Sequence, residues 1–188
     1  HVRAPMVFNP RFAAAGLDHI MVPIDAPTDS LEEIVRGLKC MPNFGGLAVT
    51  MPHKMAMAAL CDDLGTVARL TGAVNAVRFD SGGHLYGDNF DGAGFVAGCR
   101  GKGFEVTGKT VLMLGAGGAA RAIAVALCMA GVDQLTIVNR NLANAKQLVD
   151  LLVTDGGFVN VTVQPLAETD GAGVDMIINS TSLGLHAD

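Results

Sequence analysis

Short apolar runs alternate with helix-length segments along the second half of the chain. The clearest run, residues 111–114, is followed by a glycine turn, an alanine-rich stretch at 119–130 and a second apolar run at 135–138. Short apolar runs bounded by glycine, with a helix between them, predict a βαβ unit with parallel strands. The pattern then predicts one more helix and two more strands, over residues 141–153, 159–164 and 175–179. Together these elements make four strands of a doubly wound sheet.

The first half of the chain also alternates between strand-like and helix-like segments. Strands are predicted at residues 19–24 and 46–50, and helices near residues 5–15, 29–39, 52–60 and 62–70. A glycine-flanked segment, residues 92–103, is predicted to be a helical connector. The chain is therefore expected to be α/β throughout, with an N-terminal three-layer domain over residues 1–101 and a second domain over residues 102–188.

Composition narrows the classes of partner. The formal net charge is −5 with 13 Lys and Arg residues that do not cluster, which argues against a nucleic-acid surface. No run of apolar residues is long enough for a membrane helix, and no secretion signal is evident. The four cysteines lack metal-ligand spacing, so we expect free thiols, no metal and a cytoplasmic location.

A glycine loop follows the run at residues 111–114. Gly115, Gly117 and Ala120 fill the three small positions of a GxGxxG/A turn, which permit the tight turn, the approach of a pyrophosphate and close helix packing. The N–H groups of the new helix, at Gly118 and Ala119, would then face the phosphates. The strand before it and the strand about 20 residues on are the context that supports dinucleotide binding. The alternative is a glycine turn that serves packing alone.

The end of the next strand indicates which dinucleotide fits. An NAD site usually carries Asp or Glu there to bind the ribose hydroxyls, whereas this chain has Asn139 and Arg140. A guanidinium at this place can pair with the 2′-phosphate of NADP. The alternative is that Arg140 is an ordinary surface charge. NADP is the predicted cofactor.

Two further segments carry candidate chemistry. Thr50 ends a predicted strand and is a candidate N-cap for a helix with Pro52 in its first turn. Lys54 then lies where the helix dipole disfavours a cation, which helps a group that must give and take a proton, although a solvated lysine is the alternative. Asp91 precedes the connecting helix, either as its N-cap or as a charge partner.

As a set, these residues resemble the shikimate dehydrogenase family. The match keeps the family's order through nearly the whole chain, which is more specific than any single motif. The matching stretches are residues 1–5, 8–9, 12, 49–54, 72–75, 89–92, 115–120, 139–140 and 179–184.

The resemblance implies a substrate domain, a C-terminal Rossmann domain for NAD(P) and an active site in the cleft between them. It implies that Lys54 and Asp91 form the catalytic pair and that Thr50 and Asn75 contact the substrate ring. Hydride would pass between the nicotinamide and a ring carbon while Lys54 exchanges a proton with the oxygen on that carbon. The stretch that contains Thr181 is expected on the cofactor side. In the family a further C-terminal segment completes the Rossmann sheet, so this domain is expected to be truncated.

The sequence departs from the family on the substrate side. The family commonly reads HSxSP, with two serines that bind the substrate carboxylate, and this chain has Val2 and Ala4 at those substrate-binding positions. Each lost charged hydrogen bond costs about 1.5–3 kcal/mol. Either Arg3 substitutes or the substrate differs. Three further departures are Ala48 for Asn, Phe90 for Thr, and Asn144 for a basic residue.

We therefore predict an NADP-dependent oxidoreductase that interconverts a cyclic hydroxy acid and its ketone, with shikimate, quinate or a relative as substrate. The resemblance would place it in aromatic amino acid biosynthesis. The alternative is a non-catalytic NADP-binding regulatory module of the same fold, and another two-domain dehydrogenase is a third reading. Its partners are expected to be small molecules, and the protein a monomer or a homodimer.

Overall fold

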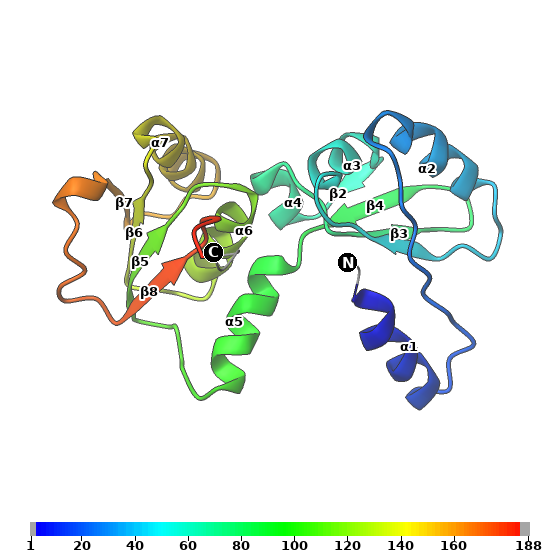
Figure 1. Ribbon diagram of the computed structural model, residues 1–188, viewed down its shortest axis with the longest axis horizontal. Helices are drawn as coiled ribbons and strands as arrows, with labels where there is room; N and C mark the ends of the chain where they lie inside the picture. Colours follow the sequence, from blue (N-terminus) through cyan, green and yellow to red (C-terminus); the bar gives the residue numbers. More distant parts are fainter. Residues whose placement is uncertain (1–2, 185–188) are drawn as a thin grey trace.

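A computed structural model describes residues 3–184 and shows two lobes, each built on one four-stranded sheet (Figure 1). The sheet of the second lobe is parallel throughout, in the order β7-β6-β5-β8. Its strands are β5 (Thr110–Leu114), β6 (Gln134–Val138), β7 (Val161–Gln164) and β8 (Met176–Asn179). The prediction of four strands in a doubly wound sheet is confirmed.

One helix follows β5 in the chain and a second helix follows β6. They are α6 (Gly118–Met129) and α7 (Leu142–Asp150), the latter continued by a π-helical turn over Leu151–Asp155. The apolar core of this lobe is formed by side chains of the strands and of α6. Met113, Leu127 and Ile137 are among its fully buried members. Strands that read as near-continuous apolar runs are typical of parallel sheets. A short 3₁₀ turn, η3 (Leu166–Glu168), lies between β7 and β8.

The sheet of the first lobe is mixed, in the order β1-β3-β4-β2. Its strands are β1 (Gly46–Ala48), β2 (Asp63–Leu64), β3 (Ala76–Phe79) and β4 (Leu85–Asp88). Its helices are α1 (Ala4–Ala14), α2 (Leu31–Lys39, preceded by the 3₁₀ turn Thr28–Ser30), α3 (Lys54–Leu60) and α4 (Thr66–Thr71). A separate apolar core that includes Val35, Met57 and Leu85 holds this lobe together. The α/β class is confirmed for both lobes, whereas the boundary at residue 101 stays a prediction.

Two expectations for the first lobe were wrong, and one hairpin was not predicted. Residues 19–24 form no strand, because Asn9 occupies both main-chain groups of Met21. Asn9 Nδ2 donates to the Met21 carbonyl at 3.0 Å, and Asn9 Oδ1 accepts the Met21 N–H at 2.7 Å. The helix predicted over 62–70 begins later, since residues 63–64 pair with β4 as β2. The hairpin of β3 and β4 was missed, although its alternating pattern around the Gly-containing turn at residues 80–84 is a recognised signal.

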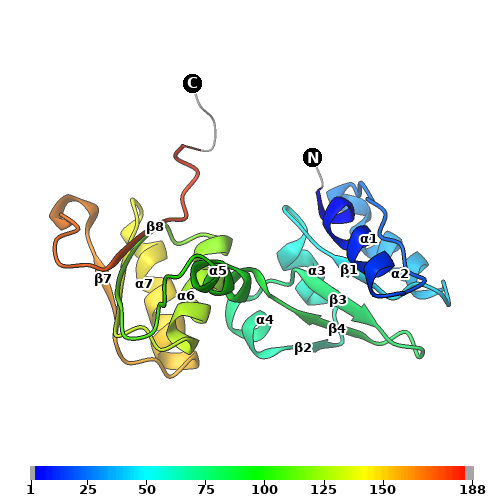
Figure 2. The same ribbon diagram turned by 90° about the horizontal axis from the view of Figure 1, so that it is seen from below.

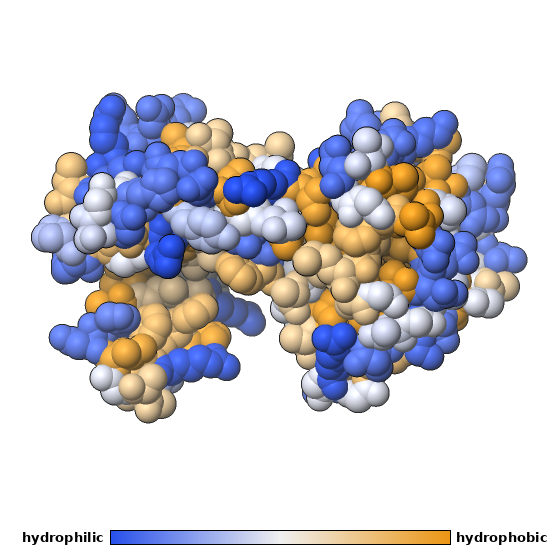
Figure 3. Space-filling model, turned by 180° about the vertical axis from the view of Figure 1, so that it is seen from behind, coloured by the Kyte–Doolittle hydropathy of each residue, from blue (hydrophilic) through white to orange (hydrophobic). Residues whose placement is uncertain are grey.

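The helix α5 (Asp91–Gly101) lies between the two lobes in both ribbon views (Figures 1 and 2). It packs on α6 so closely that a Cβ on Gly92 would collide with the carbonyl of Ala122 and with Ala126. Its first turn is therefore fixed beside the middle of α6. The predicted connecting helix over 92–103 is confirmed. Seen from behind, the surface is notched between the two lobes (Figure 3).

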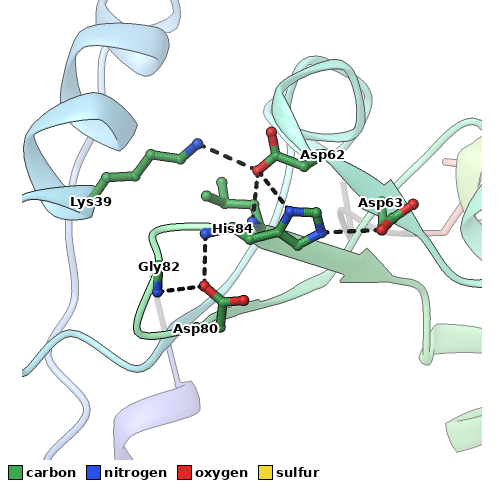
Figure 4. A network of polar contacts seen from close by, with 7 residues as sticks. Lys39, Asp62, Asp63, Asp80, Gly82 and His84 are labelled. Atoms are coloured by element: carbon green, nitrogen blue, oxygen red, sulfur yellow. Dashed lines mark hydrogen bonds and ion pairs between the residues drawn. The ribbon is translucent and has the colours of Figure 1, made fainter.

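A polar network ties α2 to the hairpin of the first lobe (Figure 4). Asp62 accepts the Leu85 N–H at 2.8 Å and Lys39 Nζ at 3.5 Å, and Asp63 contacts the His84 ring at 3.1 Å. The Leu85 N–H, followed by Lys39, lowers the pKa of Asp62. The N–H groups of His84 and Gly82 lower the pKa of Asp80 in the adjoining turn.

We predict that these two aspartates make stability fall on acidification. A carboxylate whose pKa is lower in the folded state stabilises it above the unfolded pKa of about 4, and that contribution is lost as pH falls through the folded pKa. The double variant Asp62→Asn, Asp80→Asn keeps the hydrogen-bond acceptors but cannot titrate. Its melting temperature should therefore fall less steeply between about pH 5 and 3. An unchanged slope would contradict the assignment.

Candidate active site

The geometry of the first lobe brings three of the predicted site residues into one hydrogen-bonded network. Lys54 Nζ donates to Asp91 Oδ2 at 2.6 Å, and Asn75 Nδ2 donates to Asp91 Oδ1 at 2.6 Å. Asn75 Oδ1 in turn accepts the N–H of Phe90 at 2.9 Å. Both carboxylate oxygens of Asp91 thus have nitrogen donors, and the short distances are those of charge-assisted bonds.

Four separate segments position this network. Lys54 is the first residue of α3, and its carbonyl accepts the Val74 N–H at 2.9 Å. Asn75 lies just before β3, where its N–H donates to the Asp88 carbonyl at 3.0 Å and its carbonyl accepts the Val49 N–H at 2.7 Å. Main-chain hydrogen bonds at the ends of β1, β3 and β4 therefore hold the network in place.

Asn89 is a positioning residue to which the sequence analysis gave no role. It is 2% exposed, donates from Nδ2 to the Ala73 carbonyl at 3.1 Å and accepts the Asp91 N–H on Oδ1 at 3.0 Å. This side chain fixes the main chain at the start of α5. An Asn two residues before an Asp at a predicted helix start is the local signal that could have identified it.

Two capping expectations need correction. Thr50 does not cap α3, because the helix begins at Lys54 and His53 occupies the cap position. The Thr50 carbonyl instead accepts the His53 N–H at 3.0 Å, in a turn that leaves the Thr50 residue exposed. Asp91 is the first residue of α5 rather than its N-cap. Of the two roles considered for Asp91, the structure shows the charge partner.

The network remains accessible to a ligand. The side chains of Lys54 and Asp91 are 25% and 35% exposed, so the ammonium is partly shielded yet reachable. A carboxylate that already accepts two N–H donors is held as an acceptor. Chemically, this arrangement leaves Lys54 as the member that can exchange a proton with a bound oxygen, while Asp91 stabilises its charged form.

The remaining substrate-side positions lie at the start of α1. Val2 lies outside the described residues. Ala4 is the first residue of α1 and partly buried, and Arg3 precedes it as an exposed residue whose side chain makes no capping bond. In Figure 1, α1 begins on the side of its lobe that faces α5.

The glycine loop joins β5 to α6 as the sequence predicts. Gly117 is the N-cap of α6, Gly118 and Ala119 are exposed in its first turn, and Ala120 is fully buried. The first N–H groups of a helix have no partner within it, and small exposed residues let an anion approach them. The loop therefore has the shape and donors that a pyrophosphate requires.

Gly115 is held in a conformation that favours glycine, with φ at +115°. Its N–H donates to the Val138 carbonyl at 2.8 Å, and a Cβ here would lie 2.6 Å from Ser180 Oγ. Ser180 is fixed after β8 by a bond from its own Oγ to the Leu114 carbonyl at 2.8 Å. Gly115 thus allows the ends of β5, β6 and β8 to meet at one edge.

The other predicted cofactor residues lie at this same edge of the parallel sheet, outside the carboxyl ends of the strands, where such sheets bind ligands. Asn139 follows β6, and its Nδ2 donates to the Asn141 carbonyl at 2.9 Å. Arg140 is exposed and has no ion pair within residues 3–184. Asn141 caps α7, accepting the Ala143 N–H at 3.0 Å. Thr181 follows β8 and donates to Asn179 Oδ1 at 2.7 Å.

The structure gives little support to a reactive thiolate at Cys128, to a metal site or to a membrane helix within the described residues. Burial raises the pKa of Cys128 to about 12, so this thiol stays protonated. Within residues 3–184, no group of three His, Cys, Asp or Glu side chains is arranged to hold a metal ion. None of the helices in that part of the chain combines the length and hydropathy that a membrane crossing requires.

Comparison with known protein families gives two matches. Residues 1–77 match the shikimate dehydrogenase substrate binding domain, and residues 100–184 match the family described as shikimate / quinate 5-dehydrogenase. The first match contains Lys54 and Asn75, and the second contains the whole glycine loop.

Individual proteins agree with the family match. The chain is 46% identical to shikimate dehydrogenase (NADP(+)) of Rubrobacter xylanophilus, over all of this chain and 66% of that protein. Its structure resembles shikimate dehydrogenase from Aquifex aeolicus (TM-score 0.87, 31% identity, 100% of this chain and 67% of that one). It also resembles 5-ketofructose reductase of Gluconobacter sp. strain CHM43 (TM-score 0.84, 36% identity, 97% of this chain and 65% of that one). The chain thus spans about two thirds of the length of such relatives, and it belongs to the shikimate dehydrogenase family.

Proposed function

We propose that the protein is an NADP-dependent oxidoreductase that interconverts a cyclic hydroxy acid and its ketone, such as shikimate or quinate. The observation that carries the proposal is the Lys54–Asp91–Asn75 network at the start of α5, next to the helix that follows the glycine loop. In this proposal residues 1–101 bind the substrate and residues 102–188 bind the cofactor. The names of the relatives from Rubrobacter and Gluconobacter, a dehydrogenase and a reductase, support this class of reaction.

Each residue of the network has a distinct part in the proposed reaction. When bound, the nicotinamide supplies the hydride acceptor or donor. During oxidation the neutral amine of Lys54 takes the proton from the substrate hydroxyl and becomes an ammonium, and during reduction that ammonium gives the proton back. Asp91 holds the ammonium at 2.6 Å and balances its charge, and Asn75 keeps the carboxylate in place. Thr50, exposed three residues before His53, offers its hydroxyl to the substrate ring.

The residues of the second lobe fit the proposed cofactor. The pyrophosphate would lie against Gly115, Gly117 and the helix start at Gly118 and Ala119, with Ala120 allowing close packing. The adenosine end would meet Asn139 and Arg140, and Thr181 would lie near the same edge. These positions fit because Gly117, Gly118 and Ala119 are small and exposed, and because Arg140 is an exposed cation at the same edge of the sheet.

Arg140 is predicted to select NADP over NAD. In the variant Arg140→Ala, the Kd for NADP should rise about tenfold or more, since each charged hydrogen bond contributes about 1.5–3 kcal/mol. The Kd for NAD should stay nearly the same. Calorimetric titration measures both Kd values. The matched control is Lys146→Ala, which removes an exposed cation of α7. Equal losses for NAD and NADP would show that Arg140 does not select.

The substrate carboxylate is proposed to bind near Arg3, because Val2 and Ala4 offer no hydroxyl donor. Arg3 is exposed at the start of α1 and its side chain makes no hydrogen bond or ion pair within residues 3–184, so its guanidinium is open to an anion. A guanidinium binds a carboxylate through two parallel bonds. Steady-state kinetics on Arg3→Ala should therefore show a higher KM with little change in kcat.

The test of the proposed function is a panel of cyclic hydroxy acids, including shikimate and quinate, assayed with NADP and the full-length protein. Steady reduction of NADP by any of them supports the proposal. Tight NADP binding with no reduction by any acid would favour the alternative, a non-catalytic NADP-binding module. We further infer small-molecule partners, a cytoplasmic location suited to four free cysteines, and a monomer or homodimer that light scattering can distinguish.

A further inference from the structure

Three large apolar side chains are exposed at positions next to, or within three residues of, Lys54 and Asp91 in the chain. Met51, Met55 and Phe90 are 81%, 73% and 56% exposed, and none of them belongs to either buried core. Met55 directly follows Lys54, Phe90 directly precedes Asp91, and Met51 lies three residues before Lys54. Scattered exposed apolar residues are ordinary, but a group beside an ion pair is typical of a ligand site.

Phe90 is the best fixed of the three. Its N–H donates to Asn75 Oδ1 at 2.9 Å, its neighbour Asn89 is buried, and its other neighbour Asp91 is held by Lys54 and Asn75. The main chain of Phe90 is therefore held by the same groups that hold the carboxylate. Its ring is 56% exposed and belongs to neither core, and its main chain directly precedes the aspartate that pairs with Lys54.

We propose that Phe90 determines substrate specificity, its ring forming, with Met51 and Met55 beside it, an apolar wall of the substrate site. This inference rests on the proposed function and adds the class of substrate. A substrate hydroxyl placed against that wall loses its water and finds no hydrogen-bond partner, which weakens binding. The protein consequently favours cyclic hydroxy acids, and their ketones, whose face toward the wall carries no hydroxyl.

The experiment compares two acids on the full-length protein. Shikimate carries several ring hydroxyls, whereas 3-hydroxycyclohexane-1-carboxylate keeps the carboxylate and a single hydroxyl. The Kd of each acid is measured by calorimetry with NADP present, and kcat/KM is measured alongside. The wild-type protein should bind the less hydroxylated acid better, and Phe90→Thr should shift the ratio of the two Kd values toward shikimate about tenfold, as one polar group in an apolar pocket does.

Two further variants make the result specific. Phe90→Leu keeps an apolar side chain and should keep the wild-type ratio, while Val159→Thr makes the same kind of change at an exposed residue just before β7 and should leave it unchanged. Circular dichroism confirms that each variant folds. A ratio that stays within about twofold in a folded Phe90→Thr, or that shifts as much in Val159→Thr, overturns the proposal. If turnover is present and the ratio is unchanged, the role of Phe90 alone fails. If neither acid binds the wild type, the role of Phe90 fails, and the proposed function fails with it only when no acid of the wider panel reduces NADP.

Discussion

Replacing Lys54 with alanine is expected to lower kcat of the full-length protein by about 10²–10⁴, because positioned proton transfer contributes that much to catalysis. Both carboxylate oxygens of Asp91 already accept a donor, whereas the partly exposed side chain of Lys54 carries a group that can exchange a proton with a substrate oxygen. The Kd for NADP should change little, since the cofactor residues belong to the other lobe. Steady-state kinetics and an NADP titration on the same preparation measure both quantities.

The matched control for Lys54 is Lys39→Ala. Lys39 also pairs with an aspartate, Asp62, at 3.5 Å, but it does so on α2 away from the network. Its removal should leave kcat close to the wild-type value. If Lys54→Ala kept activity with a substrate that the wild type turns over, Lys54 would have no place in the mechanism.

The variant Asp91→Asn separates charge from geometry. An amide can still accept a bond from Lys54 or Asn75, but it removes the negative charge that stabilises the ammonium. We expect kcat to fall, but less than in Lys54→Ala, because the lysine stays in place while the charge that holds it is lost. A kcat equal to that of the wild type would mean that the negative charge of Asp91 has no part in catalysis.

The second large effect is expected at the glycine loop, where Gly115→Ala should both destabilise the fold and weaken NADP binding. The residue has φ at +115°, and its new Cβ would lie 2.6 Å from Ser180 Oγ. Strained backbone of this kind costs about 1–3 kcal/mol before the collision is counted. Chemical denaturation should therefore show a loss of at least about 2 kcal/mol, and NADP titration a loss of affinity.

Two other glycines provide the controls. Gly117→Ala meets nothing within 4 Å and has φ at −82°, so the fold should survive while the added methyl obstructs the pyrophosphate. Gly94→Ala, in α5, also meets nothing within 4 Å and should leave NADP binding unchanged. It should even stabilise the helix by about 0.5–1 kcal/mol. If Gly115→Ala behaved like Gly94→Ala, the steric explanation of the loop would be wrong.

Much of the second lobe could be predicted because its signals are local. The run at residues 111–114, the glycine turn and the alanine-rich helix after it follow one another within about 20 residues, and each is encoded by its own composition. The first lobe was harder. Its strands have two to four residues each, and β2 pairs with β4 across more than 20 positions of the chain. Elements this short are held by pairing rather than by their own periodicity.

The candidate site divides in the same way. Their places at predicted helix starts and the family resemblance singled out Lys54 and Asp91, but the choice between N-cap and charge partner for Asp91 depended on a contact across 37 residues. The buried anchor Asn89 was not assigned, because its role depends on where the Ala73 carbonyl lies. Thr50 was predicted to cap α3, but residues 50–53 form a turn and the helix begins at Lys54. The start of a helix depends on local geometry and not on residue type alone.

The βαβ unit with its glycine loop and the connecting helix are encoded in short stretches of the sequence, because they follow from local backbone preferences and hydrophobic periodicity. The folded arrangement added three features. It joined Lys54, Asp91 and Asn75 into one network, placed Ser180 against Gly115, and left Phe90 exposed beside the ion pair. The physical reason is that such contacts link residues far apart in the chain, so they exist once both lobes have packed and not before.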